Sequence, residues 1–135
     1  MAKTNHFVSS QARKCRKQYF NATKDAKHIA LSAQLSKELQ ETHGIKRLPI
    51  HRDDEVQGTI GDRSISGKVL EVRLRQMRII VENCGKVKDN GQHVALPVHP
   101  SNLVITKLKM DKHRKELIDK KKAGREAALK KLGRA

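Results

Sequence analysis

The sequence predicts a mainly β protein, a small barrel flanked by two basic arms. The first observation is the placement of charge: residues 1–52 hold 11 Lys or Arg and 3 Asp or Glu, residues 53–105 hold 7 and 7, and residues 106–135 hold 12 and 4. The three net charges are therefore +8, 0 and +8, which sum to +16. The second is a series of short apolar runs, separated by turn residues, in the neutral middle. This layout is typical of a folded body whose extensions bind a polyanion.

The body, residues 49–108, contains five predicted strands. The second alternates between apolar and polar residues with period two, as a half-buried strand does. The third is more apolar, as in a strand covered on both faces, and Asp89-Asn90-Gly91 after it is a strong turn signal. Closure into a barrel is one way to remove the exposed edges of so small a sheet. The five ranges are Glu55–Ile60, Lys68–Leu74, Met77–Cys84, His93–Val98 and Leu103–Lys107.

The N-terminal arm, residues 1–48, combines irregular basic sequence with short helices. Its densest basic stretch, residues 13–21, is predicted to be irregular because four cations in five residues cannot be buried. Thr23 is placed to cap a helix over residues 24–31. Ser36 is placed to cap a second helix over residues 37–43, which Gly44 would end.

The C-terminal arm, residues 109–135, predicts one basic helix. Asp111 is its N-cap candidate, and Lys120–Lys122 lie in its middle. Gly124 costs about 1 kcal/mol relative to alanine and marks a point where the helix could bend or fray. We expect both arms to be disordered or weakly helical alone, and to become ordered when a partner neutralises their charge.

Several classes of function are disfavoured by the sequence. No run of about 18 apolar residues is present, so we expect no membrane span. Cys15 and Cys84 form neither a disulfide framework nor a close pair, which indicates a reducing compartment and no zinc or other cofactor. The acidic group Asp53-Asp54-Glu55 is interpreted as a charged cap on the barrel. No P-loop, dinucleotide fingerprint or Ser-His-Asp context appears, so we predict neither an enzyme nor a small-molecule substrate.

The amino-acid sequence resembles that of the universal family of large-subunit ribosomal proteins that carry a KOW motif, numbered twenty-four in bacteria and twenty-six in eukaryotes. The match runs in order through nearly the whole chain and is similar to the eukaryotic branch. It departs from the family in the first KOW loop, residues 58–66, which lacks a Lys-Gly step, and at Asn102. The stretches that carry it are Phe7–Ser10, Arg16-Lys17, Phe20–Ala22, Leu35–Leu39, Arg52–Gln57, Gly67–Val69, His99–Ser101 and Val104–Lys112.

The resemblance implies an SH3-like KOW barrel that binds large-subunit ribosomal RNA near its 5′ domain, beside the nascent-chain tunnel exit. It also implies neighbouring ribosomal proteins as partners, one copy per ribosome, a role in subunit assembly and translation, and a cytoplasmic location with transit through the nucleus. Two alternatives stay open. One is a KOW-type transcription-elongation or RNA-processing factor, and the other is a histone-like DNA-compacting protein.

We predict that RNA is bound mainly through its phosphates, with little sequence readout because aromatic residues are so scarce. Tyr19 is favoured as a ring that stacks on an unpaired base, while Phe20 is equally suited to stacking or to anchoring the arm. The imidazole of His99 could donate to a phosphate. The predicted RNA-binding residues are Arg13, Lys14, Arg16, Lys17, Tyr19, Phe20, Asn21, Lys37, Arg47, His51, Arg52, Lys68, His99, Lys107, Lys109, Lys112, Arg114 and Lys115.

Overall fold

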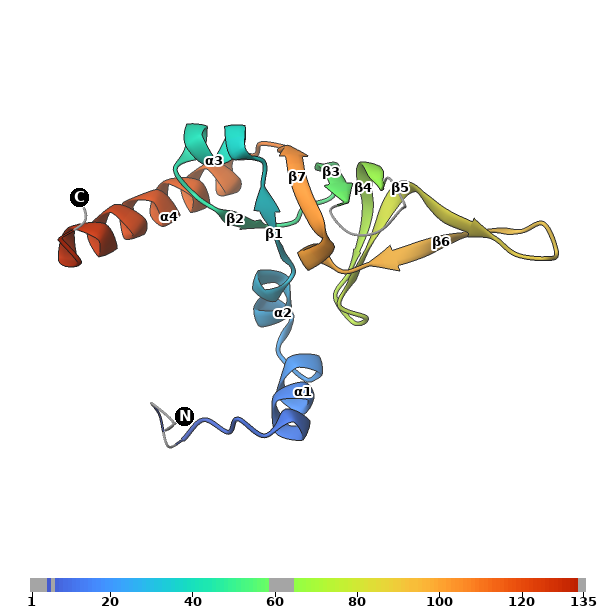
Figure 1. The fold of residues 1–135 in the computed structure, drawn as a ribbon, viewed down its shortest axis with the longest axis horizontal. Helices are drawn as coiled ribbons and strands as arrows, with labels where there is room; N and C mark the ends of the chain where they lie inside the picture. The colour runs from blue at the N-terminus through green and yellow to red at the C-terminus, as the bar shows by residue number, and fades with distance from the viewer. Residues whose placement is uncertain (1–4, 6, 59–64, 134–135) are drawn as a thin grey trace.

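The chain forms a curled sheet from which three projections extend (Figure 1). The structure is a computed structural model and describes residues 5, 7–58 and 65–133. In Figure 1, α4 projects to one side, α1 and α2 extend below, and the hairpin of β5 and β6 projects to the other side. The elements are α1 (Ala12–Phe20), α2 (Lys24–Ala30), β1 (Ser32–Leu35), α3 (Lys37–His43), β2 (Arg47–Pro49), β3 (Glu55–Gly58), β4 (Ser66–Arg73), β5 (Arg78–Val87), β6 (His93–Val98), η1 (Pro100–Asn102), β7 (Leu103–Lys107) and α4 (Lys112–Lys131).

Seven strands make one mixed sheet in the order β2-β1-β7-β3-β4-β5-β6. The β1–β7 pair is parallel and the other pairs are antiparallel. Near the end of the order, Ile80 of β5 pairs with Pro97 of β6, and the next pair is Gly85 with Ala95. Four residues of β5 therefore lie opposite one of β6. This bulge bends the ladder, and the hairpin beyond it leaves the body of the sheet (Figure 1).

The five predicted strands are all present, and the mainly β, SH3-like fold class is confirmed. The last two have the predicted bounds. The third begins one residue later than predicted, because Met77 has a left-handed φ of +53° in the turn before it, and it continues to Val87. The first ends at Gly58 within the part of the chain that the structure describes, and the predicted end at Ile60 lies outside that part.

Two strands, β1 and β2, were not predicted, and they extend the sheet into the N-terminal arm. Ala33, Leu35 and Leu48 from these strands are almost completely buried, in one core with Val56, Val69 and Ile105. One core therefore continues across the predicted boundary between residues 48 and 49. The sequence signal was weak because β1 and β2 are only 4 and 3 residues long.

Three helices agree with their sequence signals. The Thr23 side chain caps α2, and the Ser36 side chain caps α3. Gly44 ends α3 with φ +67°, a conformation that glycine adopts without steric cost. Asp111 caps α4 by accepting a hydrogen bond from the Arg114 amide at 2.7 Å. The last helix is continuous through Gly124.

The prediction of irregular structure for residues 13–21 was wrong, because α1 spans Ala12–Phe20. Arginine, lysine and glutamine are good helix formers, so a helix satisfies the backbone while the charges stay in water. No residue of α1 is buried. The helix therefore contributes nothing to the core.

Candidate nucleic-acid interface

The first candidate surface is one face of α1. Arg13, Arg16, Lys17 and Phe20 are spaced three or four residues apart, so they share a side of the helix. The Arg16 guanidinium lies 5.6 Å from the centre of the Phe20 ring, and 42% of Phe20 is exposed. This face presents three cations and an aromatic ring to solvent, a combination that fits phosphates and an unpaired base.

Tyr19, whose ring meets the Phe20 ring edge to face with centroids 5.1 Å apart, ties α1 to the sheet. Its hydroxyl is 2.9 Å from Nε2 of His99, the residue before η1. The Ser101 amide donates to Nδ1 of His99, so Nε2 carries the proton and donates to the Tyr19 oxygen. Burial, with a smaller effect of Arg78, lowers the pKa of His99 and favours this neutral form. The Tyr19 hydroxyl is thus engaged within the protein, whereas Phe20 is the more exposed ring, and stacking on a base stays a prediction for both.

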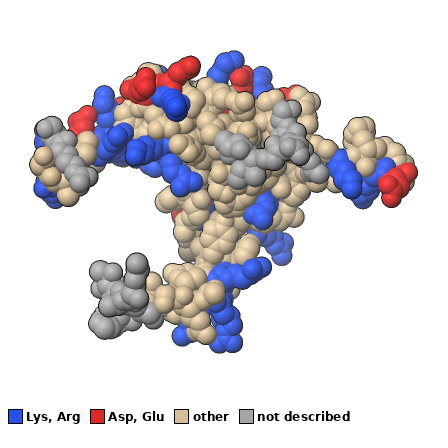
Figure 2. All heavy atoms as spheres, in the orientation of Figure 1, with Lys and Arg blue, Asp and Glu red and all other residues tan. Residues whose placement is uncertain are grey.

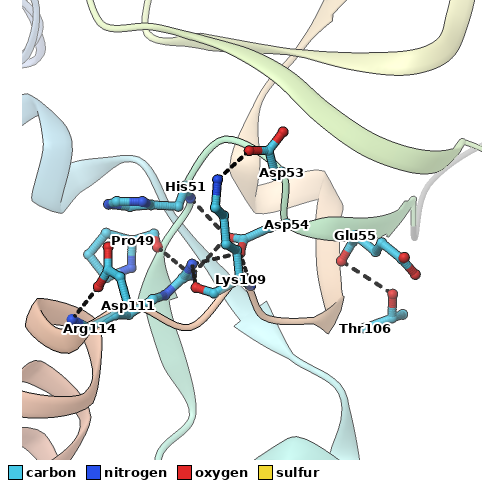
Figure 3. A network of polar contacts seen from close by, with 9 residues as sticks. All are labelled: Pro49, His51, Asp53, Asp54, Glu55, Thr106, Lys109, Asp111 and Arg114. Atoms are coloured by element: carbon cyan, nitrogen blue, oxygen red, sulfur yellow. Dashed lines mark hydrogen bonds and ion pairs between the residues drawn. The ribbon is translucent and has the colours of Figure 1, made fainter.

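A buried ion pair fixes the start of α4 to the sheet (Figure 3). The two terminal guanidinium nitrogens of Arg114, Nη1 and Nη2, donate to Asp54, at 2.6 and 2.7 Å, and the two residues are 4% and 0% exposed. The Asp54 carboxylate also accepts from the amides of His51 and Lys109, at 2.8 and 2.9 Å. Arg114 donates further to the Pro49 carbonyl. One carboxylate therefore joins the segment after β2, the segment after β7 and the first turn of α4.

Arg114 was predicted to bind RNA, and the structure removes it from that set. Its guanidinium is enclosed and occupied by Asp54 and two backbone carbonyls. Asp53-Asp54-Glu55 was interpreted as a charged cap on the barrel, but Asp54 is buried and is the partner of Arg114 in this ion pair. A carboxylate that accepts four hydrogen bonds is fully satisfied and has no free lone pair for acid–base chemistry.

Two predicted lysines near this pair have partners of their own. Lys107 lies 3.0 Å from Glu55, and Lys109 donates to Asp53 at 2.5 Å. The Lys109 hydrogen bond lowers the pKa of Asp53. Both lysine side chains remain more than half exposed, at 75% and 56%. They are therefore accessible to a phosphate, which would compete with the carboxylates for them.

The second candidate surface is the exposed side of α4. Figure 2 shows basic side chains along the underside of the α4 projection and over α1, with a broad hollow between the two projections. Lys121 donates to the Arg47 carbonyl and Arg125 to the Gly44 carbonyl, which holds the middle of α4 against β2 and α3. The exposed cations of α4 are Lys112, Lys115, Lys120, Lys121, Lys122, Arg125, Lys130 and Lys131.

The other predicted residues are spread over the same molecule rather than gathered at one point. Lys37 begins α3, Arg47 begins β2, and Lys68 lies in β4; all three are exposed or partly exposed. Arg52 is exposed in the segment between β2 and β3, and the adjacent His51 is half-buried. Asn21 is exposed and forms the C-cap of α1.

Two properties of the described residues bear on this interface. Across residues 5, 7–58 and 65–133, no group of three or more His, Cys, Asp or Glu side chains is arranged to hold a metal ion. Among the helices in that same part of the chain, none has the length and apolar character needed to cross a bilayer.

Comparison with known proteins decides the family. Residues 9–121 match the family model that describes the eukaryotic ribosomal proteins L26 and their archaeal counterparts. The chain belongs to this family. The matched region runs from before α1 into the middle of α4, and so includes the whole sheet, all of the first candidate surface and much of the second.

Curated relatives agree along almost their full length. The chain is 48% identical over 122 residues to the large ribosomal subunit protein uL24A of Saccharomyces cerevisiae, covering 90% of this chain and 96% of the relative. It is 42% identical over 124 residues to uL24 of Caenorhabditis elegans, covering 91% and 87%. It is 38% identical to uL24 of Littorina littorea, covering 98% and 93%.

Sequence reasoning missed two parts of this arrangement. Lys121 and Arg125 were not chosen, because nothing in a run of basic residues says which of them will reach a backbone carbonyl. His28 was also missed, although the structure places its ring against His51, with centroids 5.8 Å apart. The signal that could have found His28 is its position in the last turn of the Thr23-capped helix, directly before the buried strand β1.

Proposed function

We propose that this chain is a structural constituent of the large ribosomal subunit and binds the RNA of that subunit. The observation that carries the proposal is the pair of basic surfaces, on α1 and α4, set on one sheet in a chain of this ribosomal family. The relatives above are named as large ribosomal subunit proteins, and none of those names is that of an elongation or RNA-processing factor.

Binding rests on phosphate neutralisation. Each phosphate contacted by Lys or Arg releases condensed counterions, so log affinity falls with log salt by about 0.7–0.9 per contact. The sheet supplies a rigid support, and the two helices, α1 and α4, reach different parts of the RNA. The aromatic content, 1 Tyr, 2 Phe and no Trp, suits recognition of RNA shape and backbone more than recognition of sequence. The proposed set is the predicted one without Arg114, with the exposed lysines of α4 added.

The finer parts of the proposal come from the family resemblance. They are a position near the 5′ domain of the RNA and the nascent-chain tunnel exit, and neighbouring ribosomal proteins as partners. They also include one copy per ribosome, a role in subunit assembly, and nuclear transit before work in the cytoplasm. We propose no catalytic role, because the densest carboxylate group is engaged in the buried ion pair and its neighbours.

Sedimentation of a native lysate tests the function. The chain should migrate with large subunits and whole ribosomes, stay there through a moderate-salt wash, and leave after extensive ribonuclease digestion. Migration in the light fractions, or with RNA polymerase, would overturn the proposal and favour the elongation-factor alternative.

A charge series tests the role of α1. Changing Arg13, Arg16 and Lys17 to glutamine should lower the salt slope of RNA binding by about 2 to 3, from three contacts. The matched control removes three cations outside the predicted set, Arg75 between β4 and β5 and Lys86 and Lys88 in the β5–β6 hairpin, and should change the slope less. Equal slopes for the α1 variant and the unmodified chain would contradict the role of this helix.

A further inference from the structure

A cavity of about 310 Å³ lies between α2, the end of β2 and the start of α4. Its walls are mainly rings and apolar groups, from His28, Pro49, His51 and Leu117, and Asp111, His113 and Arg114 complete the lining. Figure 3 shows Pro49, His51, Asp111 and Arg114 together at this place. The volume is at the lower end of the range for small-ligand sites, so it suits one ring system rather than a larger molecule.

The two histidine rings form a wall between this cavity and a second hollow of about 200 Å³. His28 and His51 line both spaces, and their rings meet edge to face, 5.8 Å apart. Ile50 and Arg52 also line the second hollow. The rings are half-buried, so each presents one surface to a space that a flat group could enter.

The imidazoles are free to interact with a ligand. Among the described residues, no hydrogen bond from protein to the ring nitrogens of His28 or His51 is present, and these rings belong to no metal-binding group. Burial, with smaller effects of His51 and Arg114, lowers the pKa of His28. A neutral imidazole is therefore favoured at neutral pH, with one nitrogen to donate and one to accept.

We propose that this cavity receives one unpaired base of the bound RNA, which stacks on the His28 ring beside the edge-to-face ring of His51. The inference rests on the proposed function and deepens it, because it adds a base-stacking site to a surface otherwise described by phosphate contacts. Two exposed cations favour RNA over a protein side chain as the occupant. Arg52 follows His51, and Lys112 lies between Asp111 and His113 of the lining, so a base in the cavity would bring its flanking phosphates beside positive charge.

The test is a titration of the full chain with single-stranded RNA pentamers of adenosine, cytidine or uridine, followed through the ring proton signals of its histidines. An abasic pentamer with the same phosphates is the matched control. We expect saturable shifts of the His28 and His51 signals with at least one base-bearing pentamer and little change with the abasic one. His43, a half-buried histidine on α3, should not respond.

Substitutions separate stacking from packing. His28→Leu removes the ring and should weaken pentamer binding by roughly 5- to 100-fold, the usual effect of losing a base–aromatic stack. His28→Phe keeps a ring and should retain the affinity, and His43→Leu should bind like the unmodified chain. Thermal melting of each variant establishes that it is folded. If His28→Leu is not folded, the affinity of His28→Phe still tests whether a ring at position 28 supports binding.

Three results would overturn the inference: equal shifts from the abasic pentamer, no shift of the two rings with any base-bearing pentamer, or unchanged affinity in folded His28→Leu. Equal shifts from an acidic peptide would assign the cavity to a protein partner instead. Failure of the proposed function is a separate result, because it would appear as loss of co-sedimentation with large subunits by the unmodified chain.

Discussion

Changing Arg114 to methionine should destabilise the fold far more than removing any exposed cation. The substitution keeps an unbranched side chain of similar reach but removes the guanidinium that pairs with the completely buried Asp54. Asp54 would retain only two hydrogen bonds, from the amides of His51 and Lys109. Its negative charge would then be buried without a counter-charge.

The expected cost is about 3–5 kcal/mol, the range for breaking a buried pair by removing one partner. Small domains are stable by only about 5–15 kcal/mol, so this one change removes a large part of the total. Arg114→Lys should fall between methionine and arginine, because a single ammonium cannot repeat the two-nitrogen contact at 2.6 and 2.7 Å.

Urea unfolding followed by circular dichroism measures the effect, since the chain has no tryptophan to report by fluorescence. Lys107→Gln is the matched control, because it breaks the exposed Lys107–Glu55 pair and should cost at most about 1 kcal/mol. A cost for Arg114→Met equal to that of Lys107→Gln would refute the reasoning. It would mean that the Arg114–Asp54 pair is solvated, or that α4 detaches without lowering the stability of the sheet.

Three other predictions concern two glycines and pH. Gly67→Ala should destabilise the sheet by about 1–3 kcal/mol, because φ is +154° and the new Cβ would lie 2.9 Å from the Glu82 carbonyl oxygen. Gly124→Ala meets nothing within 4 Å in the middle of α4 and should raise helicity at 222 nm, with a gain of about 0.5–1 kcal/mol; a loss of helicity would contradict this. The lowered pKa values of His28 and His99 mean that the folded state binds fewer protons than the unfolded state. Stability is therefore fully present above pH 6.5 and declines as pH falls below it, so melting at pH 5 should come at a lower temperature than at pH 7.5, with a smaller difference in His28→Leu.

The sequence predicted those parts of the fold whose signals are local. Alternation in residues 68–74, the Asp-Asn-Gly turn, and the Thr23, Ser36 and Asp111 caps each depend on residues within a few positions of one another. The fold class followed because several such signals agreed. The parts that failed depend on distant partners or on no packing at all, as in β1, which pairs in parallel with β7, and α1, which buries nothing.

The candidate site was predicted at the level of segments and not of single residues. A basic run contains cations of different roles that look alike in sequence. Arg114 lies next to Lys115, yet the first is buried against Asp54 and the second is exposed. Only the path of the chain, which brings residues 54 and 114 together across 60 positions, separates them. Tyr19 and Phe20 also differ although their rings meet edge to face, because the Tyr19 hydroxyl bonds to His99 and 42% of Phe20 is exposed.

The buried Arg114–Asp54 pair also lowers the conformational entropy that RNA binding must cost. If both arms were disordered before they met RNA, each ordered residue would oppose association by the loss of its conformational entropy. Arg114 and Ile118 instead fix the first turns of α4 to the sheet, and Lys121 and Arg125 hold its middle to backbone carbonyls. The cations of this half are therefore placed before RNA arrives. The folding cost is confined to α1, which is held mainly through Tyr19, and to the last turns of α4. Loss of the Arg114 pair should consequently weaken RNA binding although Arg114 itself contacts no phosphate.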